Sequence, residues 1–158
     1  MGSDDTDDDD QPTIRVPIQV AFDGLLSAID AKAEASDVTL SAGASEDAVQ
    51  FAEQALGVTF PAEVRAFFLR HDGGPDGAIV VGGTSLLSLA KIVDRWGTWT
   101  EKLSVPIGAD AAGAHHVVDL SPGEGGRRGQ IRRIAADGGS TVVAPSLLAW
   151  LGGATWGK

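Results

Sequence analysis

The three histidines of the chain are the residues with the widest possible chemistry, because imidazole can bind metal ions and transfer protons near neutral pH. His115 and His116 are adjacent, and neighbours in a strand point to opposite faces, so they cannot bind one metal ion together. No sequence pattern indicates that His71, Asp72 or Asp119 lies close to His115 or His116 in the fold. His71 is better explained at the end of a helix, where a cationic side chain suits the helix dipole. We therefore predict neither a metal site nor a cofactor.

A serine nucleophile is the second possibility, because Ser88-Leu89-Ala90-Lys91 matches SxxK and would place a lysine one helical turn from a hydroxyl. The companion SDN and KTG triplets are missing, as are GxSxG and HExxH. Ser88 is well explained as the N-cap of the helix that follows it. We therefore predict no catalytic residue and no enzymatic activity, and a hydrolase is kept as the less favoured alternative.

A glycine-rich segment, Gly123 to Gly129, has the composition of a phosphate-binding loop. Such a loop needs a strand before it and a helix after it, whose N-terminal amides bind the phosphate. Here Arg128 occupies the position of the last glycine, and a strand is expected to follow. The segment is therefore predicted to be a hairpin loop. Val80 to Thr84 is a still weaker match, which lacks the lysine.

Four guanidinium groups lie within seven residues, on Arg127, Arg128, Arg132 and Arg133. Because Arg132 and Arg133 point to opposite sides of a strand, one of them must meet a carboxylate or lie in an interface. The net charge of −10 argues against nucleic acid as a ligand, since phosphate binding needs clustered Lys and Arg. A solvated strand face is expected, with an acidic patch on a partner as the alternative.

The negative charge is concentrated at the start of the chain. Six of the 22 acidic residues are at positions 4, 5 and 7 to 10, which leaves sixteen acids against twelve bases in the rest. Residues 1–13 are predicted to be a disordered tail, because so polar a segment cannot bury apolar surface. The acidity is typical of salt-adapted or high-GC bacterial proteins, and it would also suit a mimic of nucleic-acid phosphate that attracts a basic partner.

The length of 158 residues predicts a single domain at residues 14–153, followed by a C-terminal tail at 154–158. The chain has no cysteine, and therefore no disulfide and no thiolate site. No apolar run approaches the ~20 residues of a membrane span. We expect a cytoplasmic protein that binds neither membranes nor nucleic acid.

Apolar residues spaced three and four apart predict the helices that must position the histidine, serine and arginine side chains discussed above. Helices are expected from Phe22, after an N-cap at Ser45, after Pro61, over Leu89 to Lys102 and from Pro145. The residues expected to be buried on the first two are Phe22, Leu25, Leu26, Ile29, Ala33, Ala48, Phe51, Ala52, Ala55 and Leu56. In the fourth helix Trp96 and Trp99 share a side, so at least one of them should pack in the core.

Short strands with Gly and Pro between them follow the helices. The first pair, a hairpin, is expected at Ala78 to Val81 and Ser85 to Leu87. An antiparallel meander is expected at Val105 to Ala109, Ala114 to Leu120, Gln130 to Ala135 and Thr141 to Val143. Helices first, then a mainly antiparallel sheet, then a closing helix predict an α+β fold rather than a doubly wound parallel sheet.

Residues 56–74, LGVTFPAEVRAFFLRHDGG, carry the most specific pattern in the chain. Gly57 can end one helix with a positive φ, and Pro61 has the φ that suits the first turn of the next. This LG end, aromatic-proline pair, FF helix and DGG turn resemble the SUKH superfamily, whose members include bacterial immunity proteins and fungal cell-wall assembly regulators. The resemblance covers about residues 22–151. Its structural motif residues here are Gly57, Pro61, Phe67, Phe68, Asp72, Gly73, Gly74, Pro106, Asp119, Gly129 and Trp150.

The resemblance implies a SUKH-like α+β fold and a non-enzymatic, protein-binding function, most often that of an immunity protein that docks on a cognate toxin and blocks it. A basic nuclease-type domain is one such toxin. The alternative is a constitutive scaffold or regulator that binds housekeeping partners. The interface is expected on the open side of the sheet and the neighbouring helix, with Trp96, Trp99, Asp110 and Arg128 as candidate residues.

Overall fold

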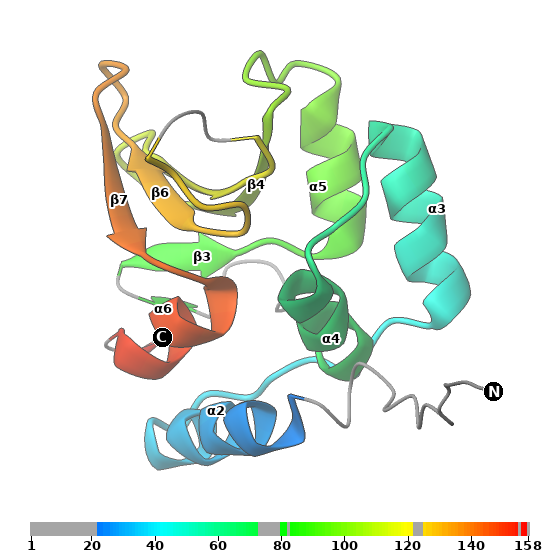
Figure 1. Cartoon of the computed structure of the whole chain (residues 1–158). Helices are drawn as coiled ribbons and strands as arrows, with labels where there is room; N and C mark the ends of the chain where they lie inside the picture. Colours follow the sequence, from blue (N-terminus) through cyan, green and yellow to red (C-terminus); the bar gives the residue numbers. More distant parts are fainter. Residues whose placement is uncertain (1–21, 73–79, 82, 122–124, 155, 158) are drawn as a thin grey trace, which may run out of the picture.

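The computed structural model describes residues 22–72, 80–81, 83–121, 125–154 and 156–157. These residues form helices and one sheet. The predicted acidic tail, Gly73, Gly74 and residues 123 and 124 of the glycine-rich segment lie outside the described residues. The helices are α2 (Asp23–Ala35), α3 (Glu46–Leu56), α4 (Ala62–Arg70), α5 (Leu89–Trp96) and α6 (Leu147–Gly153) (Figure 1). α4 packs against α3 and α6, α2 packs on α6, and α3 packs on α5.

The strands form one antiparallel sheet in the order β7-β6-β5-β4-β3-β2-β8. They are β2 (Val80–Val81), β3 (Thr84–Leu86), β4 (Ser104–Ala109), β5 (His115–Asp119), β6 (Ile131–Ile134), β7 (Ser140–Ala144) and β8 (Trp156–Gly157). From β2 to β7 each strand pairs with the next one in the sequence. The predicted α+β fold, with N-terminal helices, an antiparallel meander and a closing helix, is confirmed.

Local capping signals explain where the helices begin and end. Ser45 Oγ accepts a 3.0 Å hydrogen bond from the backbone N–H of Ala48 at the start of α3, and Gly57 ends that helix with a φ of 70°. Ser88 Oγ accepts from the N–H of Lys91 at the start of α5. The hydroxyl of the SxxK match is thus bonded as a helix cap.

The core lies between α4, α6 and one face of the sheet. Phe67 and Phe68 of α4 are buried and meet edge to face, with ring centroids 5.5 Å apart. On that side, the imidazole of His116 stacks on the indole of Trp150 from α6. The loop after α5 lies on the opposite face, where the Trp99 ring meets the imidazole of His115 from β5 edge to face.

Four predicted core residues are wrong, since Leu25 is 55% and Phe51 66% exposed, and Ala48 and Ala55 are exposed as well. In α2 the buried residues are Leu26, Ile29 and Ala33. In α3 the stripe that faces α4 and α5 is Val49, Ala52 and Leu56, one position away from the stripe built on Phe51, Ala48 and Ala55. Both stripes have helical spacing, and the tertiary contacts select between them.

The segment expected to be a C-terminal tail contributes a strand instead. β8 pairs with β2, with Trp156 opposite Val81. The Trp156 side chain is buried, and its Nε1–H donates a 2.7 Å hydrogen bond to the Leu151 carbonyl. An indole with both its apolar body and its N–H satisfied stabilises the end of the sheet.

Candidate functional site

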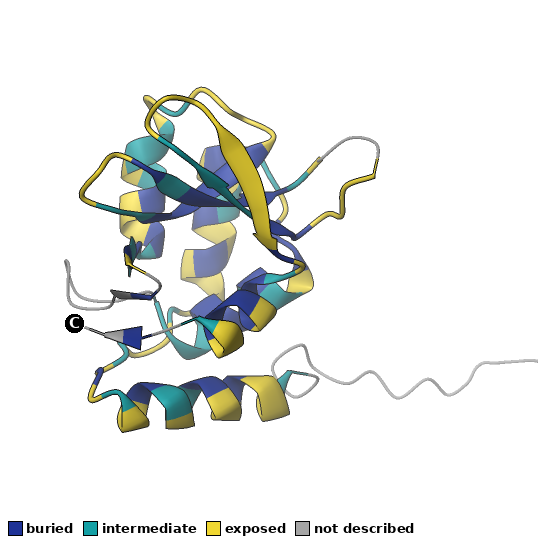
Figure 2. Cartoon of the chain, turned by 90° about the vertical axis from the view of Figure 1, so that its left-hand side faces the viewer, coloured by how far each residue is buried: buried dark blue, intermediate teal, exposed yellow. Residues whose placement is uncertain are grey.

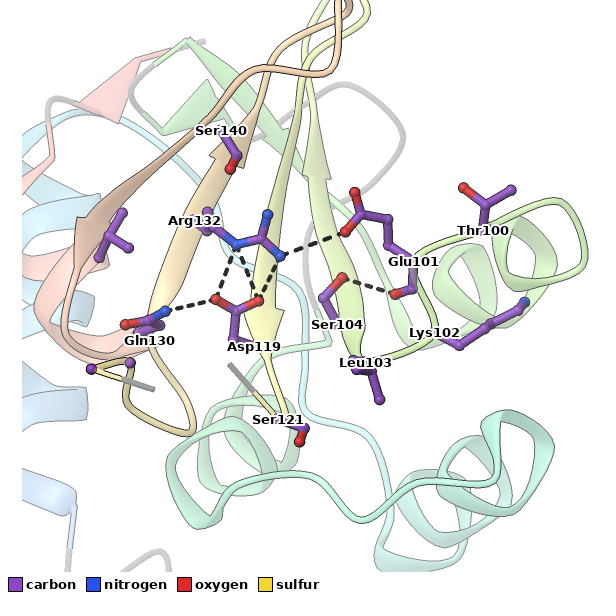
Figure 3. Close-up of a pocket in the computed structure, with 13 residues that line it drawn as sticks. Thr100, Glu101, Lys102, Leu103, Ser104, Asp119, Ser121, Gln130, Arg132 and Ser140 are labelled. Atoms are coloured by element: carbon purple, nitrogen blue, oxygen red, sulfur yellow. Dashed lines mark hydrogen bonds and ion pairs between the residues drawn. The ribbon is translucent and has the colours of Figure 1, made fainter. Parts of the chain in front are cut away.

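A cleft of about 740 Å³ opens on the face of the sheet opposite α6, between β7 and the loop that joins α5 to β4 (Figure 3). We call it the sheet cleft. The residues that line it are Thr100, Glu101, Lys102, Leu103, Ser104, Asp119, Ser121, Gly125, Gly126, Gln130, Arg132, Ser140 and Val142.

An ion pair forms the floor of the sheet cleft. Asp119 at the end of β5 is only 3% exposed, and its carboxylate accepts hydrogen bonds from Nε and Nη2 of Arg132 on β6 and from Nε2 of Gln130. The bonds to Asp119 raise the pKa of the Arg132 guanidinium above its ordinary value. No described residue bonds Arg132 Nη1, which extends from the side of the guanidinium that does not face Asp119 (Figure 3). The floor is therefore a fixed charge pair with one free donor group.

The α5–β4 loop, residues 97–103, forms the wall facing β7. Trp99 Nε1–H donates to the carbonyl groups of Glu101 and Ser104, at 3.0 and 3.2 Å, and the Lys102 ammonium lies 4.2 Å from the centre of the Trp96 ring. These contacts fix the loop so that the Leu103 side chain is 66% exposed at the edge of the cleft. The sheet cleft thus combines a rigid charged floor with an exposed apolar side chain.

Comparison with known protein families identifies the family of this chain. The model of the SMI1 / KNR4 family (SUKH-1) matches residues 43–153, which is most of the chain. The chain belongs to the SUKH-1 family. A search of curated proteins found no matching relative. Membership supports a protein-interaction domain in a family that is generally non-enzymatic, and it confirms the resemblance seen in the sequence.

The four residues expected at the interface are not all together in this SUKH-1 domain. Trp96 and Trp99 belong to α5 and the loop that walls the sheet cleft, where their contacts position the loop. Asp110 accepts hydrogen bonds from the N–H groups of Ala112 and Ala114, so its carboxylate shapes the β4–β5 turn. Arg128 donates from Nη2 to the Thr59 carbonyl and is not among the residues lining the cleft.

Leu103 and Val142 at the edges of the cleft were not predicted from the sequence, and neither was the pairing of Asp119 with Arg132. Arg132 or Arg133 was expected to meet a carboxylate or to lie in an interface. Both meet a carboxylate, since Arg132 pairs with Asp119 and Arg133 Nη2 lies 3.4 Å from Asp110. A signal for the cleft existed in Gly97, which weakens the predicted long helix. α5 indeed ends at Trp96, and the following residues form the loop rather than a helix to Lys102.

The two adjacent histidines lie on opposite faces of β5, as predicted. His115 Nε2 is 3.1 Å from Arg95 Nη1, and its ring meets Trp99 edge to face. His116 Nδ1 is 2.8 Å from Thr84 Oγ1 on the α6 side. Within the residues that the structure describes, no three His, Cys, Asp or Glu side chains are grouped so that they could hold a metal ion.

His71 and Asp72 act at helix ends. The His71 ring joins α4 to α2 through Asp30, with Nε2 2.6 Å from Asp30 Oδ1, while its Nδ1 lies 2.7 Å from the Ser41 carbonyl. Burial opposes ionisation of Asp30, but hydrogen bonds from Arg70 and His71 lower the pKa of its carboxyl. Asp72 Oδ1 accepts from the N–H of Leu89 at the start of α5.

Of the helices described, none is long and apolar enough to cross a membrane.

Stability is expected to fall as the pH drops below about 6.5, because burial lowers the pKa of both His115 and His116. Neighbouring Arg95 adds to this shift at His115 and Arg133 at His116. The unfolded chain then binds protons that the folded chain does not, so stability present above the unfolded pKa is lost as the pH falls toward the folded one. Urea unfolding between about pH 8 and 5 measures the loss.

His116→Gln is the control variant, and its profile should be flatter than the parent's over this range. The carboxyl groups of Asp30 and Asp110 have pKa values lowered from 3.8, so their contribution changes at more acidic pH. A variant profile as steep as that of the parent would contradict the assignment to His116.

Proposed function

We propose that this SUKH-1 domain is an immunity protein, which binds a cognate bacterial toxin through the sheet cleft and the α5–β4 loop and so blocks it. The observation that carries the proposal is the cleft itself, which places an exposed apolar side chain and a free guanidinium donor group beside a rigid floor. Inhibition by contact requires these features rather than an assembled set of reactive groups.

Pre-organisation is the physical advantage of this floor. The Asp119 carboxylate already accepts from Arg132 and Gln130, so a partner that covers it leaves no acceptor unpaired. Little side-chain entropy is lost when such a fixed surface is bound. Leu103, which extends from the loop, supplies apolar area that a partner can remove from water. Slow dissociation follows from this combination, and an inhibitor of a lethal enzyme needs it.

Charge favours a basic toxin. The chain carries a formal net charge of −10, which would attract a basic nuclease-type domain and accelerate its association. The rate of association should therefore fall as salt is added, whereas the rate of dissociation should change much less.

The direct test is co-expression with the products of the adjacent reading frames, one of which is expected to be the toxin domain. Rescue of growth by the parent chain, together with a stable complex of the two purified proteins, is the expected result. A chain that protects against no such toxin and instead retains several metabolic or signalling proteins would contradict the proposal and favour the scaffold or regulator of the cell-wall assembly type.

Leu103→Lys is expected to weaken the complex with that toxin domain roughly 30-fold, because a charge replaces an exposed apolar side chain in the proposed interface. Isothermal titration calorimetry measures the loss. Phe51→Lys is the matched control, since Phe51 on α3 is exposed to the same 66% as Leu103 but does not line the cleft. Equal loss in both variants, or loss at Phe51 alone, would place the interface elsewhere.

A further inference from the structure

β7 ends the sheet on the side of the sheet cleft, and no described residue pairs with its outer edge. Figure 2 shows this strand exposed along most of its length, and Ser140, Thr141, Val142 and Val143 are all exposed. Its outward N–H and C=O groups form a row of unpaired donors and acceptors. Such an edge can accept another strand.

Charged residues and proline, which usually protect an edge strand, are missing from β7. The strand reads Ser-Thr-Val-Val-Ala, with no charged residue, and the first proline comes after it, at Pro145. In natural proteins, Lys, Pro, a bulge or a short length keeps an edge strand from pairing with another chain. The opposite edge of the same sheet follows that rule, because β8 is only two residues long. β7 itself carries a bulge at its C-terminal end, where Val143 is the extra residue opposite the step from Ile131 to Arg132, and Ser140 to Val142 remain in regular register.

The register shows which backbone groups are free. The N–H of Ala135 donates to the Gly139 carbonyl and closes the β6–β7 hairpin at 2.7 Å. Hydrogen-bonded and non-hydrogen-bonded pairs alternate along an antiparallel ladder, so the pairs Ile134–Ser140 and Arg132–Val142 are of the second kind. The N–H and C=O groups of Ser140 and Val142 therefore point away from β6.

The same two residues line the sheet cleft. Every second side chain of a strand added to β7 would lie on the face of the sheet that carries Val142, in line with the cleft. Val142 is 52% exposed and offers an apolar cross-strand contact to such a side chain. The edge is thus continuous with the proposed toxin-binding surface.

We propose that the protein partner supplies an extended segment, which adds to β7 as a further strand next to the sheet cleft. This inference rests on the proposed function. A segment of a basic partner is the occupant that charge favours, because two copies of a chain with a net charge of −10 repel each other. The backbone of the segment bonds Ser140 and Val142, and its alternate side chains extend the contact into the cleft.

Amide hydrogen exchange of the full chain, alone and with the neighbouring toxin domain, tests the inference. Exchange at the amides of Ser140 and Val142 should slow about tenfold or more in the complex. Val142→Pro removes one outward N–H and should weaken binding about tenfold. Val142→Lys keeps the N–H but adds a charge that repels a basic segment, and it should also weaken binding. Leu25→Lys, at a residue 55% exposed on α2, should bind as the parent does.

Binding by the parent with unchanged exchange at both amides would overturn the strand addition while leaving the proposed function intact. Absence of binding by the parent would overturn the proposed function and this inference with it. Slow exchange at both amides in the free chain, together with a dimer in sedimentation, would overturn the addition of a partner segment. The edge of β7 would then pair with a second copy of this chain. Circular dichroism of both Val142 variants separates loss of binding from loss of fold.

Discussion

Replacement of Asp119 by alanine is expected to lower the free energy of unfolding by about 3 kcal/mol. The substitution removes the acceptor of two groups of Arg132 and of the Gln130 amide. It leaves the partly buried guanidinium with only its longer ion pair to Glu101, at 3.7 Å. Urea unfolding followed by tryptophan fluorescence measures the loss.

Two companion variants identify the cause of that loss. Arg133→Met removes a more exposed and longer ion pair from the same strand, with Arg133 Nη2 3.4 Å from Asp110, and it should cost much less. The double variant Asp119→Leu with Arg132→Met replaces the whole pair by apolar groups and should be more stable than Asp119→Ala alone. A double variant that is the least stable of the set would contradict this account of the floor.

Gly43→Ala is expected to destabilise the fold by a similar amount, about 3 kcal/mol, although it adds a single methyl group. The segment before α3 runs against the end of α4, where the N–H of Ala44 donates to the Phe68 carbonyl and that of Asp72 to the Ala42 carbonyl. A Cβ at Gly43 would overlap the carbonyl oxygen of Leu69, which is backbone and cannot rotate away. Thermal unfolding measures the effect.

Gly24→Ala is the matched control, because a Cβ there meets nothing within 4 Å. Gly24 lies in α2, where alanine is the better helix former, so this variant should gain up to about 1 kcal/mol. Opposite signs for the two variants are expected. The same sign in both would show that close backbone packing at Gly43 is not what requires glycine.

The elements with strong local signals could be predicted from the sequence. α4 follows from Pro61 and the paired phenylalanines, and the strands β4 to β7 follow from short apolar runs between Gly and Asp turns. In these segments the same residues that stop one element also orient the next. Which face of α3 is buried could not be predicted, because Phe51 and Val49 both lie on stripes of helical spacing and only the packing of α4 and α5 decides between them.

The candidate site was harder to predict from the sequence, because the meeting of its residues depends on the register between β5 and β6. Asp119 and Arg132 lie thirteen residues apart, and they meet only because β5 and β6 pair as Val117 with Arg132. A shift of one residue would send Arg132 to the other face. Residues chosen for their chemical type, such as Asp110 and Arg128, bond the chain's own backbone instead.

β8 bears on how short a functional version of the protein can be. The family match ends at residue 153, four residues before the end of β8. A recombinant form trimmed to that match would lose Trp156, which would leave a hollow beside Leu151 and take away the neighbour of β2. β2 would then be an unpaired edge strand, which could pair with a strand of another protein or of a second copy of this chain. The minimal stable form is expected to extend through Gly157.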